Sequence, residues 1–127
     1  MIARMPKGCS VFLVEDETLI RMMVADMLAE LGCHVAAEAG HIDAAIKLAR
    51  STKFDLAILD VNVNGELIFP VAEAVKARNR PIIFATGYGS LPEEYQKHPR
   101  LQKPFELEAL AQAIDETLNG AREIPPL

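Results

Sequence analysis

Five polar residues stand at or just after the ends of short runs predicted to be strands, where parallel strands would bring their side chains together. The set holds three acids, one hydroxyl and one amine: Glu15, Asp16, Asp60, Thr86 and Lys103. The carboxyl ends of parallel strands meet at one edge of a sheet, so we expect these side chains to converge there. Taken singly, each has a simpler role, such as a helix N-cap for Asp16 or a solvated lysine for Lys103. Our interpretation therefore depends on their joint occurrence at successive strand ends.

Three carboxylates at one edge repel one another, which suggests a bound cation. Two unit charges about 4 Å apart cost about 4 kcal/mol at an effective dielectric near 20. Mg²⁺ removes that cost, because carboxylate oxygens, carbonyls and water are the ligands it prefers. Beside Mg²⁺, the Asp60 carboxylate can attack an anionic phosphoryl donor and form an aspartyl phosphate. Lys103 and Thr86 would then contact phosphoryl oxygens.

The rest of the chain reads as alternating strands and helices. Strands are predicted at residues 10–14, 34–38, 55–59, 81–85 and 100–102. Apolar residues recur at helical spacing around residues 19–31, 42–49, 66–78 and 107–118. The strand runs are almost continuously apolar, as expected when helices cover both faces of a sheet. The alternation predicts an α/β fold: a doubly wound, five-stranded parallel sheet with helices on both faces, flavodoxin-like, with strand order 2-1-3-4-5.

Length, composition and charge narrow the functional class. The chain has 127 residues, half of them apolar, which fits one domain with a packed core. With 13 basic and 18 acidic residues, its formal charge is −5, so we expect no nucleic-acid or membrane partner. The chain has no signal-peptide run, and we expect a cytoplasmic protein. Cys9 and Cys33 lack paired spacing and are expected to be buried thiols.

Four segments carry a family resemblance. They are VFLVEDE with Glu15 and Asp16, LAILDVN with Asp60, FATGYG with Thr86, and LQKPF with Lys103. Over about residues 9–119 the sequence resembles the receiver domain of two-component response regulators. FATGYG and DVNVNGE are similar to the FAT GUY subgroup of mostly single-domain receivers.

The resemblance implies a role for each site residue. Glu15, Asp16 and Asp60 would be the acids of a Mg²⁺ site, with the backbone carbonyl of Asn62 as a further ligand. Asp60 would be the phosphoacceptor. Thr86 and Lys103 would be its phosphoryl contacts.

The resemblance also implies a signalling module rather than an enzyme, with self-dephosphorylation expected. We expect a stand-alone receiver domain over residues 8–120, followed by a loose tail at 121–127 and no output domain. A histidine kinase or phosphotransfer protein would phosphorylate it. It would then bind an unknown downstream protein or act as a phosphate sink.

Three positions depart from the common receiver pattern. Glu15 is one methylene longer than aspartate, and Asn64 replaces a common proline. Arg100 stands where an aromatic switch residue is usual, which puts the usual switch in doubt. We expect a switch loop instead, made of Gly87, Tyr88, Gly89 and Arg100. Residues 87–99 have room for only about six helical residues between Pro92 and Pro99, with Leu91 and Tyr95 as anchors, and are expected to be mobile before phosphorylation.

Two alternatives remain open at this point. A haloacid-dehalogenase-type phosphatase also uses an aspartyl phosphate after a strand, but it needs a second acid two residues later, where this chain has Asn62. A degenerate receiver used only as a scaffold would not need the complete set of acids, threonine and lysine. Incubation with acetyl phosphate and Mg²⁺ separates the three classes of protein.

Overall fold

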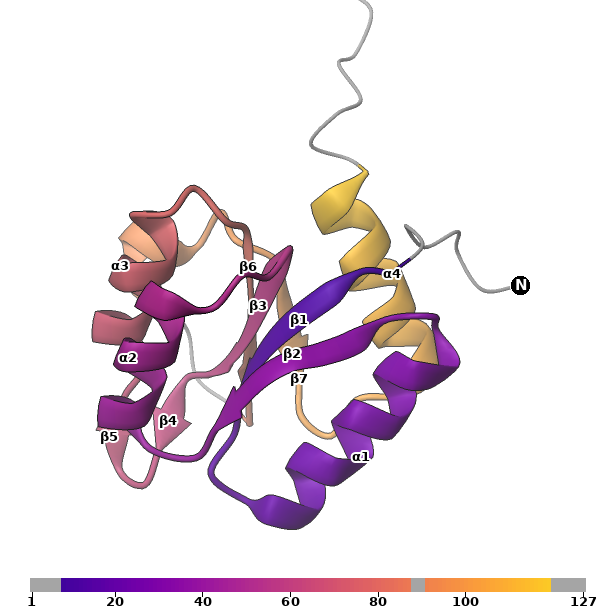
Figure 1. Ribbon diagram of the computed structural model, residues 1–127, viewed down its shortest axis with the longest axis horizontal. Helices are drawn as coiled ribbons and strands as arrows, with labels where there is room; N and C mark the ends of the chain where they lie inside the picture. Colours follow the sequence, from indigo (N-terminus) through magenta and orange to yellow (C-terminus); the bar gives the residue numbers. More distant parts are fainter. Residues whose placement is uncertain (1–7, 88–90, 120–127) are drawn as a thin grey trace, which may run out of the picture.

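A five-stranded parallel sheet lies between two pairs of helices in the computed structural model, which describes residues 8–87 and 91–119 (Figure 1). The sheet strands are β1 (Ser10–Val14), β2 (His34–Ala39), β3 (Leu56–Asp60), β6 (Ile82–Thr86) and β7 (Arg100–Gln102). The α-helices are α1 (Thr18–Glu30), α2 (Ile42–Ser51), α3 (Phe69–Lys76) and α4 (Leu107–Leu118). The sheet order is β2-β1-β3-β6-β7, and all neighbouring strands are parallel. Since β6 and β7 are the fourth and fifth strands of this sheet along the chain, the order confirms the predicted fold and the predicted strand order 2-1-3-4-5.

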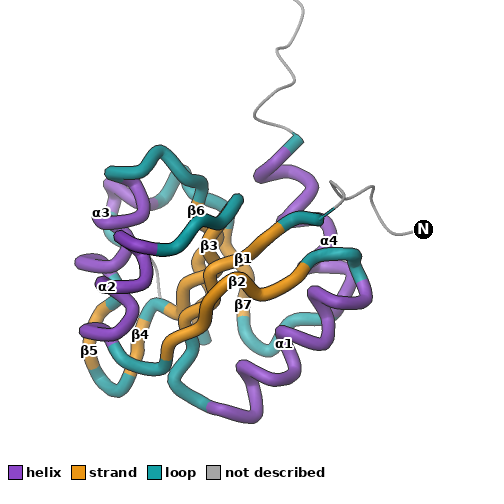
Figure 2. The backbone as a smooth tube through the Cα atoms, viewed as in Figure 1, coloured by secondary structure: helices purple, strands orange, loops and turns teal. Residues whose placement is uncertain are grey.

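The sheet has a hydrophobic core on each face, because successive strand residues point to opposite sides. Phe12, Leu59 and Phe84 face α2 and α3, and all three are fully buried. Leu13 and Ile58, their neighbours in β1 and β3, face α1 and α4. The two helix pairs lie on opposite sides of the strands (Figure 2). Burial on both faces explains why β1, β3 and β6, the three inner strands, are almost continuously apolar.

The third helix begins later than predicted. We expected it around residues 66–78, but α3 starts at Phe69, with Pro70 in its first turn. Residues 62–67 instead form an antiparallel hairpin of β4 (Asn62–Val63) and β5 (Glu66–Leu67). The turn residues Asn64 and Gly65 have φ angles of 54° and 82°. Two left-handed residues in a row are the geometry of a two-residue hairpin turn, which Asn-Gly favours.

The segment before β7 forms less helix than the distance between Pro92 and Pro99 in the sequence allows. It forms one 3₁₀ turn, η1 (Glu93–Tyr95), instead of about six helical residues. Leu91 and Tyr95 are buried in the core, as predicted for its anchors. The Tyr95 ring stacks on Phe69 at 4.7 Å between centroids and meets Phe84 edge-on at 5.5 Å. The predicted switch residues Tyr88 and Gly89 lie outside the described residues.

Both cysteines are buried, as the sequence predicted. Contact with the Cys33 thiol, together with burial, raises the pKa of Cys9, which keeps its thiol protonated. Among the described residues, no helix has the length and apolar character that crossing a membrane requires.

Candidate functional site

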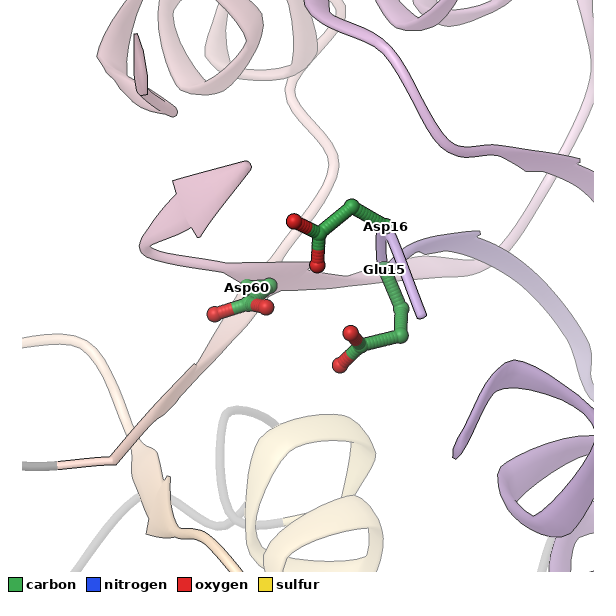
Figure 3. A group of neighbouring side chains, drawn as sticks. All are labelled: Glu15, Asp16 and Asp60. Atoms are coloured by element: carbon green, nitrogen blue, oxygen red, sulfur yellow. The ribbon is translucent and has the colours of Figure 1, made fainter. Parts of the chain in front are cut away.

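The three predicted acids meet at the carboxyl-end edge of the sheet. Glu15 and Asp16 follow β1, and Asp60 ends the neighbouring strand β3. The β1–β3 register pairs Val14 with Leu59, so the residues that follow emerge side by side. One carboxylate oxygen from each acid lies within 4.8 Å of the others. Figure 3 shows the three carboxyl groups turned towards a common space.

Glu15 and Asp60, the two inner acids of the site, are buried but lie beside a positive charge. Glu15 is only 3% exposed and Asp60 only 6%. Lys103 Nζ lies 2.8 Å from Glu15 Oε1 and 3.0 Å from Asp60 Oδ2, so one ammonium contacts both acids. Burial raises the pKa of Glu15, and the hydrogen bond from Lys103 offsets only part of that effect. Glu15 therefore holds its negative charge less readily than an exposed glutamate does.

The lysine is held in place by the charges it compensates. Burial opposes the charged form of Lys103, but the hydrogen bonds that its ammonium donates to Glu15 and Asp60 outweigh it and raise the pKa of the ammonium. The backbone N–H of Lys103 donates to the carbonyl oxygen of Thr86 over 2.8 Å. That bond ties the start of the β7–α4 connection to the end of β6. The structure therefore brings Lys103 to the acids and places Thr86 at the same sheet edge.

Asp16 differs from the inner acids because it is only partly buried. Burial works against its charge, but a hydrogen bond from the backbone N–H of Asn64 keeps the pKa of this carboxyl below its usual value. At pH 7 this side chain is ionised. The site thus offers one firmly charged carboxylate beside two that share a lysine.

This donor set suits a hard divalent cation. Each acid accepts a backbone N–H bond: Glu15 from Glu17, Asp60 from Asn62, and Asp16 from Asn64. The Asn62 side chain accepts a bond from Gly65 N–H inside the hairpin turn, so it is engaged away from the acids. A contribution of Asn62 to a metal would then come from its backbone carbonyl. Oxygen ligands from two strand ends and one loop match what Mg²⁺ prefers.

Two of the remaining predicted positions lie in the described part of the chain. Gly87 directly follows β6 and lies next to Thr86 in sequence. Arg100 is exposed at the start of β7, where it pairs with Phe84. Tyr95, not residue 100, supplies the buried aromatic ring beside Phe84.

The sequence reasoning missed two residues that support the acids. Arg21 on α1 donates from Nη1 to the carbonyl oxygen of Glu15 over 2.7 Å and from Nε to Glu38 Oε1 over 2.8 Å. Asn64 binds Asp16 through its backbone N–H at 2.8 Å. The Asn-Gly pair was a usable hairpin signal for Asn64. Nothing in the spacing pointed to Arg21.

An apolar groove of about 240 Å³ runs beside the site, between α1 and the β7–α4 connection. It is lined by Lys103 of the acid site and by Ile20, Met23, Val24, Met27, Pro104 and Phe105. The neighbouring surface of α1 exposes three large apolar side chains: Leu19, Met22 and Met23. Apolar surface therefore reaches the mouth of the acidic site.

Comparison with known proteins agrees with this geometry. The family model described as the response regulator receiver domain matches residues 11–115. The transcriptional regulatory protein PdtaR of Mycobacterium tuberculosis H37Rv is 36% identical over 123 residues. The match covers 92% of this chain and 60% of PdtaR, so the chain spans less than two thirds of that relative.

Solved structures share the fold. SdrG from Sphingomonas melonis Fr1 is 38% identical, with a TM-score of 0.77 over 87% of this chain and 96% of that chain. The receiver domain of the sensor histidine kinase PA1611 from Pseudomonas aeruginosa, solved with magnesium in its active-site cleft, is 20% identical. Its TM-score is 0.72 over 87% of this chain and 98% of that chain, and this likeness shows the fold alone. With the family model matching most of its length, the chain belongs to the response regulator receiver domains of two-component signalling.

Proposed function

We propose that Asp60 accepts a phosphoryl group, in a Mg²⁺-dependent reaction, from a histidine kinase or a phosphotransfer protein. One observation carries this proposal: Asp60 ends a central strand with Glu15, Asp16 and Lys103 around it. Asp60 is the last residue of β3 itself, whereas Glu15 and Asp16 lie beyond the end of β1, in the β1–α1 connection. The central acid is thus the best candidate for attack.

Each residue has a separate task in this proposal. Glu15, Asp16, Asp60 and the carbonyl of Asn62 would hold Mg²⁺, which supplies positive charge to the acids and the incoming phosphoryl oxygens. An Asp60 oxygen forms the new O–P bond as the N–P bond of the donor phosphohistidine breaks, and the imidazole nitrogen keeps the electron pair. Lys103 and the Thr86 hydroxyl would contact the phosphoryl oxygens. Water attack on the same phosphorus would later release phosphate, which is self-dephosphorylation.

The surface around the site suits a protein donor. A phosphohistidine reaches Asp60 only if its domain covers the mouth of the site. The groove next to Lys103 and the exposed Leu19, Met22 and Met23 provide apolar contact area there. We expect Met23→Glu to slow transfer from a protein donor and to leave labelling by acetyl phosphate unchanged. Equal slowing with both donors would contradict docking at this groove.

Intact mass after incubation with acetyl phosphate tests the function itself. With Mg²⁺ the chain should gain about 80 Da, the mass of one phosphoryl group. Mg²⁺ removal and Asp60→Asn should each abolish the gain. Steady release of phosphate without an adduct would favour the phosphatase, and absence of any reaction would favour the scaffold. After phosphorylation, we propose that the domain signals through a downstream protein or drains phosphate from the pathway.

A further inference from the structure

The tip of the β4–β5 hairpin reaches across to the acid site. Asn64 is left-handed, with φ of 54°, and so is Gly65. This conformation directs the backbone N–H of Asn64 to Asp16 Oδ2, 2.8 Å away and 48 residues distant in sequence. The β1–α1 connection that carries Asp16 therefore takes one of its supports from the hairpin turn.

The Asn64 side chain is anchored as well. Its Nδ2 donates to the carbonyl oxygen of Gly40 over 2.8 Å and lies 3.3 Å from His41 Nδ1. Gly40 follows β2, and a Cβ added there would lie 2.7 Å from Arg21 Nη1. The same Nη1 donates to the carbonyl oxygen of Glu15. The hairpin tip and Arg21 therefore meet at one junction, and each holds one of the two adjacent acids.

We propose that Asn64 is a positioning residue for Asp16, and that it acts on the Mg²⁺ site assigned above, on which this inference rests. The carboxamide fixes the hairpin tip against Gly40, and the backbone N–H then fixes the Asp16 carboxylate. A ligand held in its binding orientation loses less conformational freedom when the ion binds. Metal affinity therefore depends on a side chain that would not touch the metal.

A second asparagine shows that a left-handed backbone alone does not account for the contact between Asn64 and Asp16. Asn79, after α3, is also left-handed, with φ of 59°. It is exposed, and its backbone N–H bonds to Lys76 within its own turn. Asn79 therefore shares the backbone conformation of Asn64 without the link to an acid, which makes it a matched control.

The test compares Asn64→Gly with Asn79→Gly. Glycine keeps the left-handed backbone and the N–H but removes the carboxamide. We expect the dissociation constant for Mg²⁺, measured by titration calorimetry on the full chain, to rise about fivefold in Asn64→Gly, on the order of one lost hydrogen bond. It should stay at the wild-type value in Asn79→Gly. Labelling by acetyl phosphate should need more Mg²⁺ in Asn64→Gly and reach the same rate at saturation.

Two results would overturn the inference. One is an Asn64→Gly affinity for Mg²⁺ equal to that of wild type. The other is a lower saturated labelling rate with an unchanged Mg²⁺ requirement, which would place Asn64 in the phosphoryl step. Failure of the proposed function looks different: the wild type would then bind Mg²⁺, with the affinity difference between variants intact, and never gain a phosphoryl group.

Discussion

Lys103 contacts Glu15 and Asp60 before any phosphoryl group is present. Its side chain is only 17% exposed, so little water screens the pair of contacts. A phosphoryl group on Asp60 would draw the ammonium towards its oxygens and away from Glu15. At the level of single residues, the lysine therefore supports the unmodified fold as well as the proposed phosphorylated state.

Lys103→Ala should destabilise the metal-free protein, because two buried acids lose their shared cation. We expect the free energy of unfolding in urea to fall by about 2 kcal/mol in EDTA. Saturating Mg²⁺ should recover most of that loss by compensating the same acids. Lys47→Ala, at an exposed position on α2, is the control. A loss that Mg²⁺ leaves unchanged would show that the lysine and the ion do not act on the same charges.

His98 makes the stability sensitive to mild acid. Burial, and to a lesser degree Lys76, lowers the pKa of its imidazole, which packs edge-on against Phe84. The neutral form is therefore favoured in the folded state. The neutral imidazole contributes fully to the free energy of unfolding above the unfolded-state pKa near 6.5. That contribution is lost as the pH falls through the lower pKa of the folded state.

Between pH 7.5 and pH 5 the wild type should thus lose more unfolding free energy than His98→Gln does. Subtracting one curve of unfolding free energy against pH from the other cancels the contribution of all groups that titrate in both proteins. His34→Gln, at an exposed strand position, should follow the wild type. Identical pH dependence in all three proteins would mean that the packing of His98 against Phe84 does not oppose protonation.

The central site residues were predictable from their places in the sequence. Asp60 follows an apolar strand run and Lys103 follows the short strand at residues 100–102, and parallel strands bring such positions to one edge. The supports of the site were not predictable in the same way. The contact of Arg21 with Glu38 joins α1 to β2, and the contact of Asn64 with Asp16 joins the hairpin turn to the β1–α1 connection. Both depend on how elements far apart in the sequence pack.

At the level of elements, the hairpin and η1 differ most from expectation. The hairpin occupies residues 62–67 and so overlaps the start of the helix predicted around 66–78, although Asn-Gly between short extended runs favours a two-residue turn. η1 starts directly after Pro92, as predicted, but it ends at Tyr95 and does not extend towards Pro99; the Tyr95 ring stacks on Phe69. The gain of order over residues 87–99 on phosphorylation stays a prediction, testable by amide hydrogen exchange with beryllofluoride.

Tyr95 should be the main anchor of the segment that leads into β7. Its hydroxyl donates to Glu73 on α3, and its ring packs between Phe69 and Phe84. Tyr95→Ala removes both contributions and should lower the unfolding free energy by about 3 kcal/mol. Tyr95→Phe removes only the hydrogen bond and should cost about 1 kcal/mol. Equal losses in urea denaturation would mean that the ring packing contributes nothing.

At the level of the whole molecule, the strands that build both cores also deliver the acids to one edge. Asp60 ends β3, whose residues are all buried, and the β1–α1 connection starts at the neighbouring strand. Repulsion at this edge therefore acts on the stability of the entire sheet. The predicted extent of the domain, residues 8–120 with a tail at 121–127, stays a prediction.

Mg²⁺ should raise the melting temperature even without phosphate. A ligand that binds only the folded state adds about 2.7 kcal/mol at one hundred times its dissociation constant. For a domain of this size that corresponds to a shift on the order of 8 °C. The melting temperature of Asp16→Ala should shift much less, since the variant lacks a carboxylate ligand whose pKa lies below its usual value. If Mg²⁺ raised the melting temperature of Asp16→Ala as much as that of the wild type, Asp16 would not be a ligand of the metal.

Identification of the modified residue tests the central claim most directly. The chain is treated with acetyl phosphate and Mg²⁺, the acyl phosphate is reduced with borohydride, and the peptides are analysed by mass spectrometry. We predict modification at Asp60 alone, and none in Asp60→Asn. Modification at Glu15 or Asp16, or full labelling of Asp60→Asn, would contradict the assignment of Asp60 as the phosphoacceptor.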